Sequence, residues 1–190
     1  MNNEGQAQAL SEQDHAVFLD YLSKTRHSVR DTAIYLMTMR AGLRIGEVAS
    51  IEMDDLLNTD GTLKEVVILR RKITKGSKTR TAYLSHPELR QSLQTYIESR
   101  PSRKTKTVFV SQKGGSFSPN SLAQLMLRHY NRSGLEGCSS HSGRRSMLSN
   151  LLKKGVDIVA VSKVAGHSSI ATTQRYIHHD QEELLKAVAL

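Results

Sequence analysis

The sequence predicts an α+β domain that is mainly helical and carries a small three-stranded antiparallel sheet. Amphipathic stretches with helix-capping residues cover most of the 190 residues, whereas only three short runs are rich in β-branched and aromatic side chains. No internal repeat or low-complexity tract interrupts this pattern. A chain of this length is long enough for one well-buried domain, or for two small ones.

The first half of the chain predicts two helices and a helical turn. Ser11 and Asp14 cap the start of an amphipathic helix. Its apolar positions are Val17, Phe18, Tyr21 and Leu22. The stretch SVRDTAIYLMTMR, residues 28–40, predicts a second and more buried helix that stops at Gly42. A short helical turn is expected over GEVASI, residues 46–51.

The three expected strands lie in the middle of the chain. A turn over NTDG, residues 58–61, leads into the β-rich run LKEVVILRR, residues 63–71. The basic loop KITKGSKTR, residues 72–80, connects this run to TAYLS, residues 81–85, so the two runs form a hairpin. TVFVS, residues 107–111, is the third predicted strand.

The second half predicts two longer helices followed by shorter helical pieces. Pro87 opens a helix that runs to about Ser99, and Pro119 begins the next one. After residue 140 the helical pattern comes in short pieces, which break at Gly155 and Gly166.

The charge balance is the most informative bulk property. A net charge of +9 and a pI near 9.8 suggest a polyanionic partner, because clustered Lys and Arg gain affinity by releasing counterions from phosphates. A solvated basic surface without such a partner is the alternative. The aromatic content of 5%, with no Trp, favours binding to the backbone of double-stranded DNA over base stacking on single strands.

Nothing in the sequence predicts export or membrane insertion. No apolar run approaches the length that spans a bilayer, and the N-terminus MNNEGQAQAL lacks the basic-then-apolar layout of a signal peptide. The single cysteine, Cys138, cannot form an internal disulfide, which fits a reducing compartment. We therefore expect a cytoplasmic protein.

Two pairs of residues are candidates for phosphate chemistry. Arg44 follows a helix end, and Glu47 can pair with it across one helical turn and fix the orientation of the guanidinium. His141 and Arg144 are also three residues apart, so one helix face presents both. This is a poor metal site but a good clamp for a phosphate. A surface arginine and a polar helix start are the alternative interpretations.

The stretch GHSSIATTQRY, residues 166–176, contains a third candidate pair. His167 lies in a loop after a glycine, and Tyr176 ends the following short helix. Lys75 lies at the tip of the basic hairpin. Taken alone, such a histidine is usually solvent-exposed and such a tyrosine usually belongs to the core or its rim.

The sequence predicts no metal site and no cofactor. Cys138 has no second cysteine, and the neighbours His178 and His179 point in different directions on a helix. Asp54 and Asp55 are adjacent and do not converge either. No P-loop, Ser-His-Asp elbow or glycosidase carboxylate pair is recognisable, so chemistry on a phosphate would have to stabilise charge with side chains.

Together these clusters resemble the catalytic domain of tyrosine recombinases, the phage integrase family. The motifs are AGLRIGEVASIEMDDL (41–56), TKGSKTR (74–80), HSGRR (141–145) and GHSSIATTQRYIH (166–178), and they follow the family's order. The resemblance covers nearly the whole chain from about Leu10. Ala165 and Arg145 depart from the family's usual Leu and His without removing a reactive group. The catalytic residues that the resemblance implies are Arg44, Lys75, His141, Arg144, His167 and Tyr176, with Glu47 in support.

The resemblance implies a site-specific recombinase or integrase that cleaves and rejoins duplex DNA through a 3′-phosphotyrosyl link, without metal. Tyr176 would be the nucleophile, His141 would assist its proton, and Lys75 would protonate the leaving oxygen. The transition state would be stabilised by Arg44, Arg144 and His167. The alternatives are a type IB topoisomerase-like activity and a DNA-binding regulator that keeps the fold without chemistry.

The expected domain organisation follows from the same resemblance. Residues 1–10 would form a flexible N-terminus and residues 11–180 the catalytic domain. Residues 181–190 would form a C-terminal helix that docks on a neighbouring protomer or packs on its own domain. We expect a monomer that assembles as a tetramer on paired DNA sites. The N-terminal helical domain typical of the family is missing from this sequence, which implies either an excised domain or a short recombinase.

Overall fold

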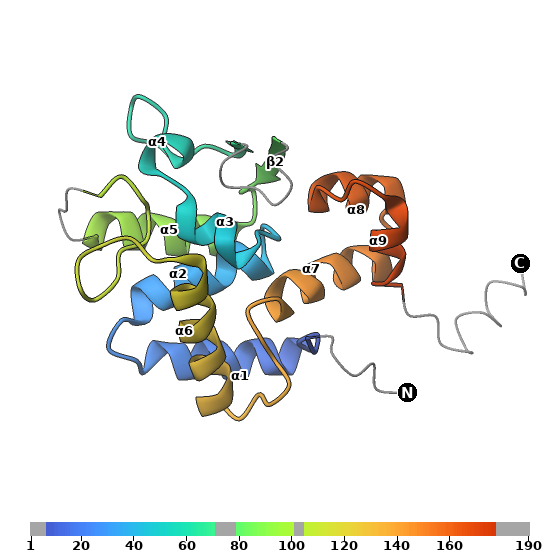
Figure 1. The fold of residues 1–190 in the computed structure, drawn as a ribbon, viewed down its shortest axis with the longest axis horizontal. Coiled ribbons are helices and arrows are strands. Elements are labelled where there is room, and N and C mark those ends of the chain that lie inside the picture. Colours follow the sequence, from blue (N-terminus) through green and yellow to red (C-terminus); the bar gives the residue numbers. More distant parts are fainter. Residues whose placement is uncertain (1–6, 71–78, 101–104, 178–190) are drawn as a thin grey trace, which may run out of the picture.

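The molecule is a helical body from which a pair of short strands and three C-terminal helices extend (Figure 1). The computed structural model describes residues 7–70, 79–100 and 105–177. In chain order the elements are α1 (Glu12–Ser23), α2 (Ser28–Met39), α3 (Ile45–Ser50), α4 (Met53–Leu56), β1 (Val66–Leu69), β2 (Arg80–Tyr83), α5 (Pro87–Ser99), α6 (Pro119–Arg132), α7 (Ser142–Lys153), α8 (Ile158–Ala165) and α9 (Ile170–Gln174). The prediction of a mainly helical α+β domain is confirmed.

Helix α2 forms the centre of the molecule. It is buried all round from Ala33 to Met39, as its largely apolar sequence predicts, and α1, α3, α5 and α7 pack against it. Phe18 of α1 meets Tyr35 of α2 edge-on at 4.8 Å between ring centroids, and it stacks on Tyr130 of α6 at 4.3 Å. These ring contacts hold α1 and α6 against the core.

A side-chain cap begins α1 where the sequence predicts it, and a second cap begins α6. The Asp14 N–H donates to Ser11 Oγ at 3.1 Å, and the Ser11 N–H donates to Asp14 Oδ2 at 2.9 Å. Ser118 and Ser121 form the same reciprocal cap at the start of α6. Each cap satisfies two N–H groups that a helix start otherwise leaves without partners.

The chain before α1 packs against the second half of the molecule. Leu10 is 4% exposed, and its N–H donates to Ser146 Oγ at 2.7 Å. The expected boundaries after residues 10 and 180 stay predictions, and the helix expected over residues 181–190 lies outside the described residues.

Within the described ranges the sheet contains two strands, so the prediction of a third strand over residues 107–111 was wrong. The two strands pair antiparallel, with Val66 opposite Tyr83 and Leu69 opposite Arg80. Their alternation places Arg80 on the same buried face as the core residues.

Residues 107–111 lie against the helical core instead. The Val108 N–H donates to the Ile51 carbonyl at 2.8 Å, and the Val108 carbonyl accepts from the Tyr96 hydroxyl at 3.1 Å. The same hydroxyl accepts from the Val110 N–H at 3.2 Å. A loop and a side chain thus satisfy backbone groups that a strand ladder would otherwise pair.

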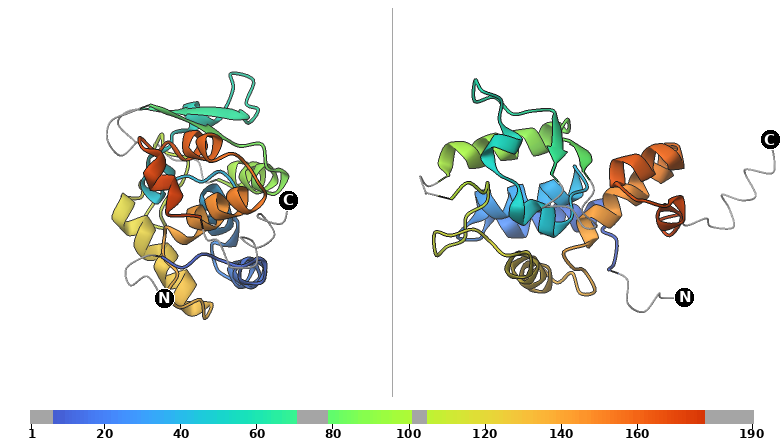
Figure 2. Two further views of the ribbon diagram at one scale, coloured as in Figure 1. Left: turned by 90° about the vertical axis from the view of Figure 1, so that its right-hand side faces the viewer. Right: turned by 45° about the horizontal axis from the view of Figure 1, so that its top comes forward.

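The C-terminal helices α7, α8 and α9 form a second, smaller core. Its buried centre consists of Leu148, Val161 and Ala165, and Met147 and Tyr176 pack against it. Figure 2 shows α8 and α9 at the far end of α7, with α8 close to the strand pair. No helix in the described part of the chain is long and apolar enough to cross a membrane.

Helix α7 lies directly against α2 at Gly143. A Cβ added there would overlap the Thr38 hydroxyl and would lie 3.2 Å from the Met39 nitrogen. Only glycine allows the first turn of α7, which carries part of the HSGRR motif, to lie this close to the central helix.

We predict that Gly143→Ala lowers the free energy of unfolding. Forcing a methyl group into such a contact costs about 1–3 kcal/mol, which exceeds the gain of up to about 1 kcal/mol in helix propensity. Thermal unfolding should show a Tm reduced by about 2–4 °C per kcal/mol. Gly115→Ala is the control, because a Cβ at Gly115 meets no atom within 4 Å. Equal stability of the two variants would contradict the prediction.

Candidate active site

A cavity of about 430 Å³ brings together the candidate residues that the structure describes. It lies where the loop before α3, the start of α7 and the helix pair α8–α9 meet. Five of the six expected catalytic residues line it: Arg44, His141, Arg144, His167 and Tyr176. The sixth, Lys75, belongs to residues 71–78, which lie outside the described ranges. Further lining residues are Ala7, Ser139, Arg145, Thr172 and Arg175.

Arg44 is held by Glu47, as the sequence predicts. Arg44 occupies the N-cap position of α3, and its side chain is 24% exposed. Its backbone N–H donates to Glu47 Oε2 at 2.8 Å, and its Nη1 donates to Glu47 Oε1 at 3.1 Å. The other donors of this guanidinium have no acceptor among the described residues and remain available to a ligand.

Arg80 is a site residue that the sequence interpretation missed. It binds the Glu47 carboxylate through Nε at 2.9 Å and through Nη2. In the sequence Arg80 is the last of several basic residues in the hairpin motif TKGSKTR, and nothing in composition separates it from the others. The sequence signal that could have identified Arg80 is the alternation of side chains along the strand. This alternation places Arg80 on the same buried face as Ala82.

Arg144 lies in the first turn of α7 and is 4% exposed. Its Nη1 donates to the Gly42 carbonyl and its Nη2 to the Ala165 carbonyl, the latter at 2.7 Å. Burial lowers the pKa of this guanidinium to about 10, and the charges of Arg44 and Arg80 act in the same direction. Arg144 therefore remains a cation at neutral pH.

His167 is a neutral hydrogen-bond acceptor toward Arg144. Its Nε2 lies 3.2 Å from Arg144 Nη2, and because arginine can only donate, Nε2 must accept. The proton then sits on Nδ1, which donates to the buried hydroxyl of Thr173 at 2.8 Å. Burial lowers the pKa of His167 to about 4, with further contributions from Arg144, Arg44 and Arg80. The sequence interpretation identified neither Thr173 nor this tautomer.

Tyr176 lies beside His167 at the end of the α9 segment. The two rings stack with 5.8 Å between centroids and an interplanar angle of 17°. The phenol is half-buried, and its backbone N–H donates to the Thr173 carbonyl at 3.0 Å. Thr173 thus holds both the histidine and the tyrosine, which fixes the spacing of the two rings.

His141 lies at the rim of the cavity, at the N-cap position of α7, and is exposed. The cavity wall includes it together with Arg144, so both side chains reach one place. Arg44, Arg144 and Arg80 face one carboxylate, Glu47, so the site carries an excess of positive charge. Such a site attracts a phosphate.

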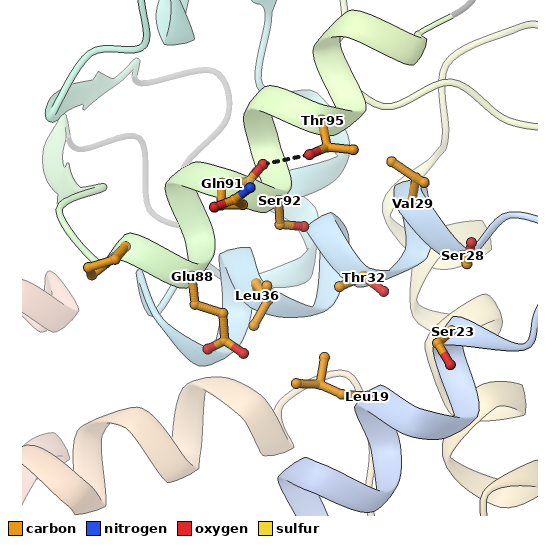
Figure 3. Close-up of a pocket in the computed structure, with 11 residues that line it drawn as sticks. Leu19, Ser23, Ser28, Val29, Thr32, Leu36, Glu88, Gln91, Ser92 and Thr95 are labelled. Carbon is orange, nitrogen blue, oxygen red and sulfur yellow. Dashed lines mark hydrogen bonds between the residues drawn. The ribbon is translucent and has the colours of Figure 1, made fainter.

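A separate groove of about 610 Å³ runs between α1, α2 and α5 (Figure 3). Its walls combine Leu19, Val29 and Leu36 with hydroxyl and amide groups. Glu88, its charged lining residue, is already bound by Arg40 at 2.7 Å. The groove therefore offers no cluster of groups for phosphate chemistry. Separately, the described residues include no group of His, Cys, Asp and Glu side chains that could hold a metal ion.

A mainly helical domain with a tyrosine, a neutral histidine and arginines at one basic cavity has the groups that a protein acting on phosphodiesters needs. Residues 8–183 match the phage integrase family, and the chain belongs to that family. The recognition made from the four sequence motifs is confirmed.

Curated relatives named tyrosine recombinase XerC match most of this chain. The relative from Pseudomonas syringae pv. tomato is 34% identical over 158 residues, which are 82% of this chain and 50% of the relative. The relative from Caldanaerobacter subterraneus is 32% identical over 165 residues, 84% of this chain and 44% of the relative. The chain thus spans about half the length of the curated relatives it matches.

Solved structures share the fold at lower sequence identity. The XerA recombinase superposes with a TM-score of 0.77 at 20% identity, covering 96% of this chain and 64% of that one. The Tn1549 transposon integrase in complex with transposon right end DNA gives a TM-score of 0.78 at 19% identity, covering 99% of this chain and 67% of that one.

We predict that the His167 imidazole is still neutral at pH 6. Its pKa is lowered to about 4, whereas an unfolded chain takes up this proton near pH 6.5. Between these values the unfolded state binds more protons, so this residue contributes stability above pH 6.5 that is lost as the pH falls toward 4. An NMR titration of the imidazole signals measures the midpoint directly.

Arg144→Met is the matched variant for this titration, since it removes one of the charges that depress the pKa. Its His167 midpoint should move upward. A wild-type midpoint near 6.5 would contradict the buried, arginine-bound geometry.

Proposed function

We propose that this chain is the catalytic part of a site-specific DNA recombinase that cleaves and rejoins duplex DNA through a 3′-phosphotyrosyl intermediate. The observation that carries this proposal is the stacking of Tyr176 on His167. His167 is hydrogen-bonded to the buried Arg144. All three residues line one cavity together with Arg44. The relatives named tyrosine recombinase XerC support it, as does the structure of XerH recombinase bound to its difH substrate.

The reaction exchanges one phosphoester for another. Tyr176 Oη attacks the phosphorus of a phosphodiester, a bond from Oη to phosphorus forms, and the bond from phosphorus to the 5′-oxygen breaks. The DNA 3′-phosphate is then joined to the protein, and the free 5′-hydroxyl is the nucleophile for rejoining. The number of phosphoester bonds stays the same, so no external energy source is needed.

The arginines stabilise the charge that develops on the non-bridging oxygens. Arg44 and Arg144 present planar guanidinium groups from two different elements, and both are oriented by hydrogen bonds before a ligand arrives. Loss of one such preorganised donor typically lowers the rate by about 10²–10³-fold. His167 acts on this charge through Arg144, because its Nε2 accepts from that guanidinium.

Two proton transfers accompany the exchange. A free tyrosine has a pKa of about 10 and needs help to lose its proton at neutral pH. His141, exposed at the rim of the cavity, takes this proton. Lys75 in the hairpin loop delivers a proton to the leaving 5′-oxygen, a contribution of about 10²–10⁴-fold in rate.

The partners in this proposal are double-stranded DNA and further copies of the chain. The net charge of +9 favours DNA, and solved relatives include a lambda integrase dimer bound to a core site. Four copies assemble on two paired sites, and residues 181–190, with their apolar Leu184, Leu185 and Val188, dock on a neighbouring protomer. The chain is a monomer without DNA.

We predict that Tyr176→Phe abolishes covalent attachment to DNA while leaving DNA binding intact, because only the attacking oxygen is removed. Wild type and variant are expressed in host cells, protein–DNA adducts are recovered under denaturing conditions, and the attached DNA is sequenced. Tyr83→Phe is the control, since Tyr83 is 47% exposed on the outer face of the sheet and should keep the adducts.

Absence of adducts from the wild type, despite expression and DNA binding, would overturn the proposed chemistry and favour a DNA-binding regulator. If adducts form, the recovered sequence is placed on two different DNA molecules. Exchange of flanks between them is expected for a recombinase, whereas relaxation of supercoils without exchange would indicate a topoisomerase.

A further inference from the structure

Arg80 is buried at the start of β2, directly beside the site. Its side chain is 7% exposed, and its stem lies against Gly166 at the end of α8. Gly166 has a φ of 63°, and a Cβ at this position would overlap Arg80 Cδ. A glycine at position 166 thus leaves space for the Arg80 side chain, which any residue with a Cβ would displace.

All five N–H groups of Arg80 have acceptors in the described part of the protein. Nε donates to Glu47 Oε1 at 2.9 Å, and Nη2 donates to Glu47 Oε2 and, at 3.5 Å, to the Gly42 carbonyl. Nη1 donates to the carbonyls of Val164 at 3.2 Å and Thr81 at 3.4 Å. Because arginine has five donors in total, none is left for a phosphate. Arg80 therefore acts on other side chains and not on a substrate.

The first of these bonds leads to Arg44. Glu47 is 1% exposed, and its two oxygens accept from Arg80 on one side and from the backbone and side chain of Arg44 on the other. Burial alone would raise the pKa of Glu47, but the hydrogen bonds and charge of Arg80 hold it below its usual value. The carboxylate that orients Arg44 is thus itself fixed and kept ionised mainly by Arg80.

The second set of bonds leads to Arg144 and to the loop of His167. Arg80 and Arg144 both donate to the Gly42 carbonyl. They also bond consecutive carbonyls at the end of α8, Arg80 that of Val164 and Arg144 that of Ala165. These carbonyls lack partners within the helix, and the helix C-terminus favours cations. The chain continues from this point through Gly166 into His167.

We propose that Arg80 is the positioning residue that sets Arg44 through Glu47 and sets the His167 loop through the end of α8. This rests on the proposed strand-transfer function, because it assigns the residues that Arg80 positions to that chemistry.

The test compares Arg80→Lys with Arg90→Lys. Lysine keeps the charge, but with three donors it cannot bind both Glu47 oxygens and all three carbonyls at once. Arg90 is the matched control, a partly buried arginine near the same strands that donates to the carbonyls of Leu63, Lys64 and Leu84 and has no bond to the site. Thermal unfolding measures the stability of both variants.

Two readouts separate positioning from folding. The first is the NMR signal of the Arg44 backbone amide, whose proton is bonded to Glu47. The second is the rate of covalent adduct formation on a nicked duplex that carries the site recovered from wild-type adducts. Arg80→Lys should shift the Arg44 amide signal, speed its hydrogen exchange and slow adduct formation by about 10²-fold. Arg90→Lys should leave the amide signal and the rate unchanged.

An unchanged Arg44 amide and a wild-type rate in folded Arg80→Lys would overturn the inference, as would equal effects in Arg90→Lys. If Arg80→Lys does not fold, Arg80→Met/Glu47→Gln replaces it, because this pair buries no unpaired charge. A wild-type rate in that double variant would also overturn the inference. Should the wild type form no adducts, the proposed function fails, while the Arg44 amide still decides whether Arg80 positions it.

Discussion

The buried ion pair between Glu47 and Arg80 is the contact on which the geometry of the site depends. Glu47 has almost no access to water, so its charge is tolerable only because arginines satisfy both oxygens. Removing one partner of such a pair costs about 3–5 kcal/mol, since the other charge is left buried and unpaired. The carboxylate therefore joins α3, β2 and the loop before α3 into one unit.

Around this contact the site concentrates positive charge that the described protein residues do not balance. Glu47 binds both Arg44 and Arg80. Burial, together with the charges of neighbouring arginines, lowers the pKa of Arg144 to about 10 and keeps His167 neutral. Repulsion between like charges destabilises the site in the absence of a ligand. Under the proposed function a bound phosphodiester would relieve this repulsion, and that relief would contribute to the affinity for DNA.

Much of the fold could be predicted because the residues that start and stop a helix lie within or beside that helix in the sequence. The Ser11 cap, the stop at Gly42 and the prolines of α5 and α6 each determine an element within a few residues. The third strand was wrong because residues 107–111 have strand composition, while the partner that decides their state, Tyr96, lies on a helix. Periodicity within a short apolar run carries no information about such a partner.

The site residues also divide into those that the sequence identifies and those that only tertiary contacts reveal. The resemblance of the motifs to one family brought His141, Arg144, His167 and Tyr176 into one list, and the structure places all four on one cavity. Arg80 and Thr173 were missed, because a residue that supports others is recognised only through its contacts. The tautomer of His167 likewise depends on Arg144 and Thr173 and not on its own neighbours in sequence.

The cavity is assembled from segments that lie near opposite ends of the chain, Arg44 in the first quarter and Tyr176 close to the last described residue. Contacts between such distant segments form late in folding, because a long loop must close before they can be made. A nascent or partly unfolded chain already carries its basic residues, which attract polyanions. Under the proposed function, such a chain holds no nucleophile next to the arginines, so only a fully folded molecule would cleave DNA.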